Sequence, residues 1–268
     1  MIRWRGPAIL LGSVLFAVLG TRTMLVRQAA AARNVIGKPL GEDALIADRT
    51  FKRKQGDRIE LLLLGDSIAA GLGADRKKQT FGAQLARRVS KRTERAVRLH
   101  TAAVVGSESS ALRSQLAGLP AGYRPHVAVI VVGGNDVTHL VRHSEAVKHL
   151  REAITALRER GCEVVVGTCP DLSALSAVPQ PLRSLAGRSS RLLATAQREA
   201  ALELGARVVS LADVVGPFFV SQPDAMFAED RFHPSGTGYR RTAKAMLPSV
   251  LAALGHADEV PYGHHEPS

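Results

Sequence analysis

The chain has 268 residues, of which 46% are hydrophobic, so it can bury the core of one domain and is not globally disordered. Its formal charge of +12 raises the question of nucleic-acid binding, but residues 1–58 supply +7 of that charge and only 4% of all residues are aromatic. No aromatic residues alternate with basic ones as in a base-stacking platform. We therefore expect no nucleic-acid partner.

The N-terminus is predicted to be a membrane anchor or a signal segment. Arg3 and Arg5 precede an uncharged run over residues 6–21, and this run is apolar on all sides, unlike an amphipathic core helix. Residues 29–32 offer small side chains for cleavage, but Arg27 lies close to them. We favour an uncleaved, single-pass anchor, with the folded domain outside the cytoplasm, over a cleaved segment and secretion.

Four segments are predicted along the chain. They are the hydrophobic N-terminal helix at 1–28, a charged linker at 29–57, a folded domain at 58–255 and a polar tail at 256–268. The linker contains Lys52-Arg53-Lys54, which could contact anionic lipid headgroups, although a solvated charged run is the simpler interpretation.

Strands and helices are predicted to alternate through the folded domain. Five apolar stretches bounded by turn residues are predicted strands, at 59–64, 96–103, 126–132, 162–168 and 206–211. Helical periodicity is clearest at 145–160, 187–204 and 238–254. This alternation predicts an α/β fold with a mostly parallel, five-stranded sheet and helices on both of its faces. Cys162 and Cys169 flank the fourth strand and are predicted to be too far apart for a disulfide.

The residues that follow these strands are unusual for a sheet buried on both faces. Gly65-Asp66-Ser67 follow the first strand, Gly106 follows the second, and Gly133-Gly134-Asn135-Asp136 follow the third. A loop containing AEDRFHPSGTGY follows the fifth. Ligands of open parallel sheets bind at the carboxyl ends of the strands. These residues are therefore expected to meet at one edge and to form the functional site.

The polar residues at this edge have the types that nucleophilic catalysis requires. Ser67 becomes a nucleophile only with a base next to it and a group that orients the base. His233 is the candidate base, and Asp230 can accept a hydrogen bond from its ring and stabilise the imidazolium. The backbone N–H groups of Ser67 and Gly106 and the side-chain amide of Asn135 are candidate donors to an oxyanion.

The motifs GDSIAAG, Gly106, GGND and DRFHP occur in this order over residues 59–254 and resemble those of the SGNH hydrolases, also called the GDSL esterase/lipase family. The resemblance implies a flavodoxin-like three-layer α/β/α sandwich. It implies a triad of Ser67, Asp230 and His233, and an oxyanion hole completed by Gly106 and Asn135. The implied activity is hydrolysis of acyl esters through an acyl-serine intermediate, without a cofactor.

Several alternatives stay open at this point. A catalytically silent relative could bind glycan or lipid in the same cleft, and an acyltransferase could pass the acyl group to a sugar or lipid. Asp66 is interpreted as a structural cap, and Asp136 either orients Asn135 or caps a helix. His139 and His143 have the i, i+4 spacing of metal ligands, but no third ligand lies near them in the sequence, so no metal site is predicted.

The loop before His233 is rich in aromatic residues. Four of the seven phenylalanines fall in GPFFVSQPDAMFAEDRFH, and a surface loop has no general reason to be this apolar. Phe219 and Phe227 are expected to line an acyl pocket or, equally, to pack the loop onto the sheet. The sequence contains no long insertion that could form a lid, so we expect an open cleft that prefers short or medium acyl groups.

Overall fold

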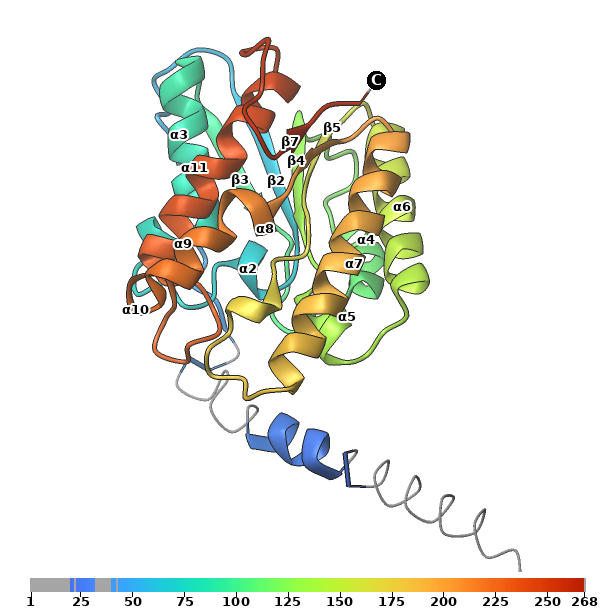
Figure 1. Cartoon of the computed structure of the whole chain (residues 1–268). Helices are drawn as coiled ribbons and strands as arrows, with labels where there is room; N and C mark the ends of the chain where they lie inside the picture. The colour runs from blue at the N-terminus through green and yellow to red at the C-terminus, as the bar shows by residue number, and fades with distance from the viewer. Residues whose placement is uncertain (1–19, 22, 32–39, 42, 268) are drawn as a thin grey trace, which may run out of the picture.

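The computed structural model describes residues 20–21, 23–31, 40–41 and 43–267. Its centre is one sheet of seven strands in the order β1-β3-β2-β4-β5-β6-β7 (Figure 1). The strands are β1 (Thr50–Phe51), β2 (Ile59–Gly65), β3 (Val97–Thr101), β4 (Val127–Val131), β5 (Glu163–Gly167), β6 (Arg207–Val209) and β7 (His264–His265). The five inner strands are parallel, whereas β1 and β7 pair antiparallel at the two edges.

The predicted α/β class and the five parallel strands are confirmed, but the expected total of five strands is wrong. The two additional strands are β1, which lies in the segment expected to be a linker, and β7, which lies in the segment expected to be a tail. Each has only two residues, too few to show an alternating pattern, and each depends on a neighbouring strand for its hydrogen bonds.

Helices cover both faces of the sheet (Figure 1). The helices that form the two layers are α3 (Phe81–Thr93), α4 (Leu112–Ala117), α6 (His143–Arg158), α7 (Leu182–Glu203) and α11 (Gly236–Ala253). The others, of four to six residues each, are α2 (Ser67–Ala70), α5 (Gly134–Thr138), α8 (Leu211–Val214), α9 (Gly216–Ser221) and α10 (Pro223–Met226), with 3-10 turns at η1 (Lys77–Gln79), η2 (Ser109–Ala111) and η3 (Leu172–Ala174). In Figure 1, α3 and α11 lie on one face, and α4, α6 and α7 lie on the other.

The four consecutive leucines of β2 are explained by this double covering. Leu61 and Leu63 belong to the hydrophobic core beneath α3 and α11. Leu62 and Leu64 point to the opposite side and belong to the core beneath α4 and α6. Because successive side chains of a strand face opposite ways, a strand buried on both faces has a continuous apolar sequence.

The predicted N-terminal hydrophobic helix lies mostly outside the described residues, which omit 1–19. Residues 20–21 and 23–31 are helical. Gln28 contacts the loop before α7, where its Nε2 donates to the carbonyl of Gln180 (2.6 Å) and its Oε1 accepts from the N–H of Leu182 (3.3 Å). Among the residues that the structure describes, none of the helices combines the length and the apolar character needed to cross a membrane.

Candidate active site

The turn that ends β2 places Ser67 at the carboxyl edge of the sheet. Gly65 has φ +131°, and a Cβ atom there would lie 1.8 Å from the carbonyl oxygen of Val131 on β4, so only glycine fits. Asp66 caps α2, because its carboxylate accepts the N–H of Ile68 at 2.9 Å. Ser67 is the first residue of α2, and its N–H therefore has no carbonyl partner within the helix.

The structure brings the three predicted triad residues together, although Ser67 and His233 are 166 residues apart in the sequence. Ser67 Oγ lies 2.9 Å from His233 Nε2, and His233 Nδ1 lies 2.5 Å from Asp230 Oδ2. The other carboxylate oxygen of Asp230 accepts the N–H groups of Phe232 and His233, each at 3.0 Å. Ser67 and His233 are each 6% exposed and Asp230 is fully buried, so water is largely excluded from this chain of hydrogen bonds.

The surroundings of Asp230 keep its carboxyl group ionised. Burial opposes the charge, but the hydrogen bond from the His233 ring, the attraction of that ring and the two backbone N–H groups outweigh burial. The net effect lowers the pKa of Asp230. An ionised carboxylate at this position holds the proton on Nδ1 of His233 and leaves Nε2 to accept from the serine hydroxyl.

The predicted oxyanion donors lie on the loops that follow β3 and β4. Gly106 has φ +79° and nothing within 4 Å of the position where a Cβ atom would stand, so its backbone is open to a ligand. Asn135, on α5, donates from Nδ2 to the carbonyl of Ser107 at 2.9 Å. This bond uses one of the two amide hydrogens of Asn135 and fixes its side chain beside the Gly106 loop, while the second hydrogen can serve another acceptor.

Asp136 supports the loop that follows β3. Asp136, whose role was left open by the sequence, accepts the N–H of Ser109 (3.1 Å to each oxygen) and its hydroxyl (2.9 Å). Burial raises the pKa of Asp136, and the bonds from Ser109 oppose that rise. The carboxylate thus holds the loop after β3 against α5. It does not cap α5.

Sequence reasoning missed Gln115. Its amide forms two hydrogen bonds with the backbone of Gly65: the N–H of Gly65 donates to Oε1 at 2.9 Å, and Nε2 donates to the carbonyl at 2.8 Å. Nε2 also lies 3.4 Å from the hydroxyl of Ser107. The available signal was a glutamine within the apolar stripe formed by Leu112 and Leu116 on α4, where a buried polar side chain requires a partner.

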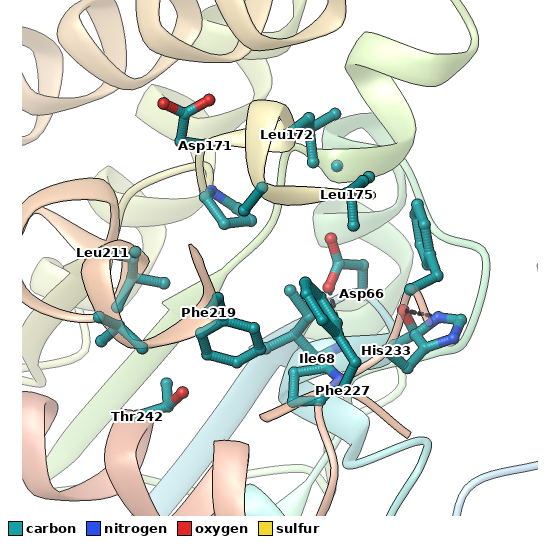
Figure 2. A pocket seen from close by; sticks show the side chains of 18 of the residues that line it. Asp66, Ile68, Asp171, Leu172, Leu175, Leu211, Phe219, Phe227, His233 and Thr242 are labelled. Carbon is teal, nitrogen blue, oxygen red and sulfur yellow. Dashed lines mark hydrogen bonds between the residues drawn. The ribbon is translucent and has the colours of Figure 1, made fainter. Parts of the chain in front are cut away.

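An apolar cavity of about 80 Å³ opens beside the serine. Ser67, Asn135 and His233 line it, together with apolar side chains that include Leu175, Leu211, Phe219 and Phe227. Phe219 and Phe227 form an edge-to-face pair with ring centroids 4.8 Å apart, and Figure 2 shows both among the side chains that line the cavity. Because both rings also belong to the hydrophobic core, they line the cavity and pack the loop at the same time.

The described residues contain no group of three or more His, Cys, Asp or Glu side chains arranged to hold a metal ion. His139 contacts Glu108 (2.8 Å) and His143 contacts Ser189 (2.9 Å). The two histidines therefore engage different neighbours.

A serine, a histidine and an ionised aspartate, joined by hydrogen bonds at the carboxyl edge of a parallel sheet and next to an apolar cavity, define a site suited to acyl transfer. Residues 63–241 match the model of the GDSL-like Lipase/Acylhydrolase family, and the chain belongs to this family. It is also 36% identical over 263 residues to the GDSL-like esterase Rv1075c of Mycobacterium tuberculosis, a match that covers 94% of this chain and 83% of that protein.

Solved structures share the fold at low sequence identity. The psychrotrophic esterase EstA from Pseudoalteromonas has a TM-score of 0.57 at 18% identity, over 73% of this chain and 98% of EstA. TesA has a TM-score of 0.55 at 22% identity, over 72% and 99%. Axe2, an acetylxylan esterase from Geobacillus stearothermophilus, has a TM-score of 0.55 at 18% identity, over 77% and 100%. At this level of sequence identity, the similarity to these structures shows a shared fold and no more.

Proposed function

We propose that this chain is a serine esterase that hydrolyses acyl esters through an acyl-serine intermediate and prefers short or medium acyl groups. The observation that supports the proposal most directly is the hydrogen-bonded series from Ser67 Oγ through His233 to Asp230. The family supplies the general activity, and the geometry of this series suggests how it is carried out.

In the first step, Ser67 Oγ attacks the carbonyl carbon of the ester while His233 Nε2 takes the hydroxyl proton. The ionised Asp230 stabilises the resulting imidazolium. His233 then returns the proton to the alkoxy oxygen of the ester. The bond between that oxygen and the acyl carbon breaks, the alcohol departs, and the acyl group remains on Ser67. In the second step, a water molecule attacks the acyl carbon with His233 again as base, which releases the carboxylic acid and restores the serine.

The negative charge that forms on the carbonyl oxygen during each attack requires donors that already point at it. The N–H groups of Ser67 and Gly106 and the second amide hydrogen of Asn135 are proposed for this role. The bond from Asn135 to the Ser107 carbonyl supports it, because a side chain that is held before substrate arrives needs no reorganisation in the transition state.

The cavity beside Ser67 is proposed to receive the acyl chain. Its volume of about 80 Å³ and its apolar lining leave room for only a few methylene groups. A chain that extends beyond Phe219 and Phe227 would have to displace these rings from the core or leave through the cavity mouth. This is why short or medium acyl groups are proposed.

The test is hydrolysis of p-nitrophenyl acetate, butyrate and octanoate by the purified full chain and its Ser67→Ala and His233→Ala variants. Each variant is expected to lose about 10³-fold or more in kcat, because removing one triad member disables the whole unit. Ser221→Ala is the matched control, since this exposed hydroxyl only donates to its own helix and its loss should leave activity unchanged.

A fluorophosphonate probe and acid-quenched mass spectrometry address the intermediate. The peptide with Ser67 should carry the probe, and it should carry an acetyl group during turnover of the acetyl ester. If Ser67→Ala keeps more than about a tenth of the activity, the nucleophile is misassigned. If the wild-type serine does not react with the probe and no ester is cleaved, the chain is a silent binding relative.

A further inference from the structure

The basic charge of the folded domain is concentrated on one surface. α3 carries Arg87, Arg88, Lys91 and Arg92, and α11 carries Arg240, Arg241 and Lys244, while neither helix contains an acidic residue. These two helices therefore hold seven positive charges and no negative ones, in a chain whose net charge is +12. They are distant in the sequence but pack against each other on the same face of the sheet (Figure 1).

The chain segment before the domain extends this surface. The turn after β1 contains Lys52, Arg53 and Lys54, all exposed. Gln55, the next residue, bonds to the hydroxyl of Ser90 on α3 (3.1 Å), so the turn lies beside the C-terminal end of that helix. We call the ten cations of this turn, α3 and α11 the basic face. The acidic residues nearest to it in sequence are Asp57 and Glu94, which leave its charge strongly positive.

The cations of the basic face lack anionic partners among the residues that the structure describes. Within the part of the chain that the structure describes, none of the ten forms an ion pair. Arg88 donates to the backbone and side chain of Gln84, and Arg241 lies 4.2 Å above the ring of Phe218. Burial lowers the pKa of Arg88, and the like charges of Arg240 and Arg87 lower it further. The cations of the two helices therefore repel one another, which an external polyanion would relieve.

We propose that the basic face docks the enzyme on a membrane surface that contains anionic phospholipid headgroups. Five of its helical cations, Arg87, Lys91, Arg92, Arg240 and Lys244, are exposed, and they project from the outer sides of two neighbouring helices. Each cation held close to an anionic bilayer strengthens binding by about fivefold. None of its ten cations lines the cavity beside Ser67.

Two observations favour a bilayer over a nucleic acid. The seven helical cations are not interleaved with exposed aromatic side chains, since Phe218 is half-buried beneath Arg241, so bases would find no stacking platform there. In addition, Lys52-Arg53-Lys54 lie downstream of the N-terminal segment that the sequence predicts to be a membrane anchor. A chain held at a bilayer by that segment would stay within reach of the bilayer surface.

The test is lysine acetylation of the full chain, followed residue by residue by mass spectrometry. It compares vesicles of phosphatidylcholine alone with vesicles of phosphatidylcholine mixed with phosphatidylglycerol. Lys91 and Lys244 are expected to lose most of their reactivity only with the anionic vesicles, and added salt should restore it. Lys148 on α6 is exposed on the opposite helical layer and should stay reactive. This readout does not depend on whether the N-terminal segment inserts.

A charge-neutralised variant locates the contact. Arg87→Gln/Arg92→Gln/Arg240→Gln retains both reporter lysines and should weaken the contact by about a hundredfold, so that Lys91 and Lys244 react as they do with phosphatidylcholine alone. Arg113→Gln/Arg124→Gln/Arg188→Gln removes three exposed arginines outside the basic face and should keep the protection. Hydrolysis of a soluble ester checks that both variants are folded.

Three results would overturn the proposal. The first is equal reactivity of Lys91 and Lys244 with both kinds of vesicle. The second is equal protection of Lys148, which would show that contact with the bilayer is not specific to this face. The third is protection of Lys91 and Lys244 by duplex DNA but not by anionic vesicles, which would assign the surface to nucleic acid.

Discussion

Gln115 pairs with both backbone groups of Gly65, at 2.9 Å and 2.8 Å, and thereby holds the end of β2 from which Ser67 projects. The two residues are 50 positions apart in the sequence. The pairing makes α4 a support for Ser67, the proposed nucleophile, although α4 contributes no residue to the cavity.

Gln115→Leu should therefore damage both stability and turnover. Leucine fills a similar volume but leaves the buried N–H of Gly65 unpaired, which should lower the free energy of unfolding by about 1–3 kcal/mol. The carbonyl of Gly65 still accepts the N–H of Val104 at 3.2 Å. A small displacement of Ser67 should lower kcat by about 10- to 100-fold with little change in KM. Denaturant unfolding and ester kinetics, normalised to sites titrated with fluorophosphonate, measure the two effects. Gln222→Leu, at an exposed position, is the control. An unchanged kcat per titrated site would show that Gln115 stabilises the fold but does not position Ser67.

Asn135→Ala should lower kcat by about 100-fold or more and leave KM nearly unchanged, because an oxyanion donor acts in the transition state. Steady-state kinetics on p-nitrophenyl acetate measure this. Thr138→Ala changes an exposed hydroxyl on the same short helix and should behave like the wild type. A change confined to KM would make Asn135 a residue that binds the ground state.

Phe219→Ala and Phe227→Ala should alter the acyl-chain preference. Each substitution enlarges the cavity, so kcat/KM for butyrate and longer esters should rise relative to acetate, by about fourfold for each additional methylene that becomes buried. Both rings are also core residues, and the melting temperature should fall. Val220→Ala, at a neighbouring position that is 66% exposed, is the control. An equal loss on every ester would mean that the two rings only pack the loop.

Asp66→Asn should change how stability depends on pH. Burial raises the pKa of Asp66 from 3.8 to about 6, against the opposing bond from Ile68. The native state therefore binds this proton more tightly than the unfolded chain, and the free energy of unfolding falls as pH rises from about 4 to about 6. The asparagine variant keeps the cap but lacks the charge.

The stability of the Asp66→Asn variant relative to the wild type should thus increase by about 2 kcal/mol between pH 4 and pH 7. Denaturant unfolding across this range measures it, with Asp75→Asn, which changes an exposed carboxyl, as the control. A stability difference that is constant with pH would show that Asp66 titrates alike in the native and unfolded states.

Local sequence was sufficient to predict the parallel sheet and to place the proposed triad residues at one edge of it. A strand buried on both faces must be apolar throughout. β2, β4 and β5 could therefore be predicted as strands from their own sequences, without knowledge of their neighbours. The carboxyl ends of parallel strands meet at one edge, so the polar residues after β2, β3 and β4 and those of the DRFHP loop could be assigned to one site before any contact was known.

Only the tertiary structure decided the features that depend on a distant partner. β1 and β7 exist because β3 and β6 offer free edges, and two residues carry no periodic signal of their own. Gln115 matters because packing brings α4 against Gly65. The net charge of residues 59–268 is only +5, and this value does not indicate the basic face. The cations of α3 and α11 are more than a hundred residues apart in the sequence, and they form one surface only because the two helices pack together. Composition records how much charge a chain carries, whereas the potential at its surface depends on the distances between charges, which the fold sets.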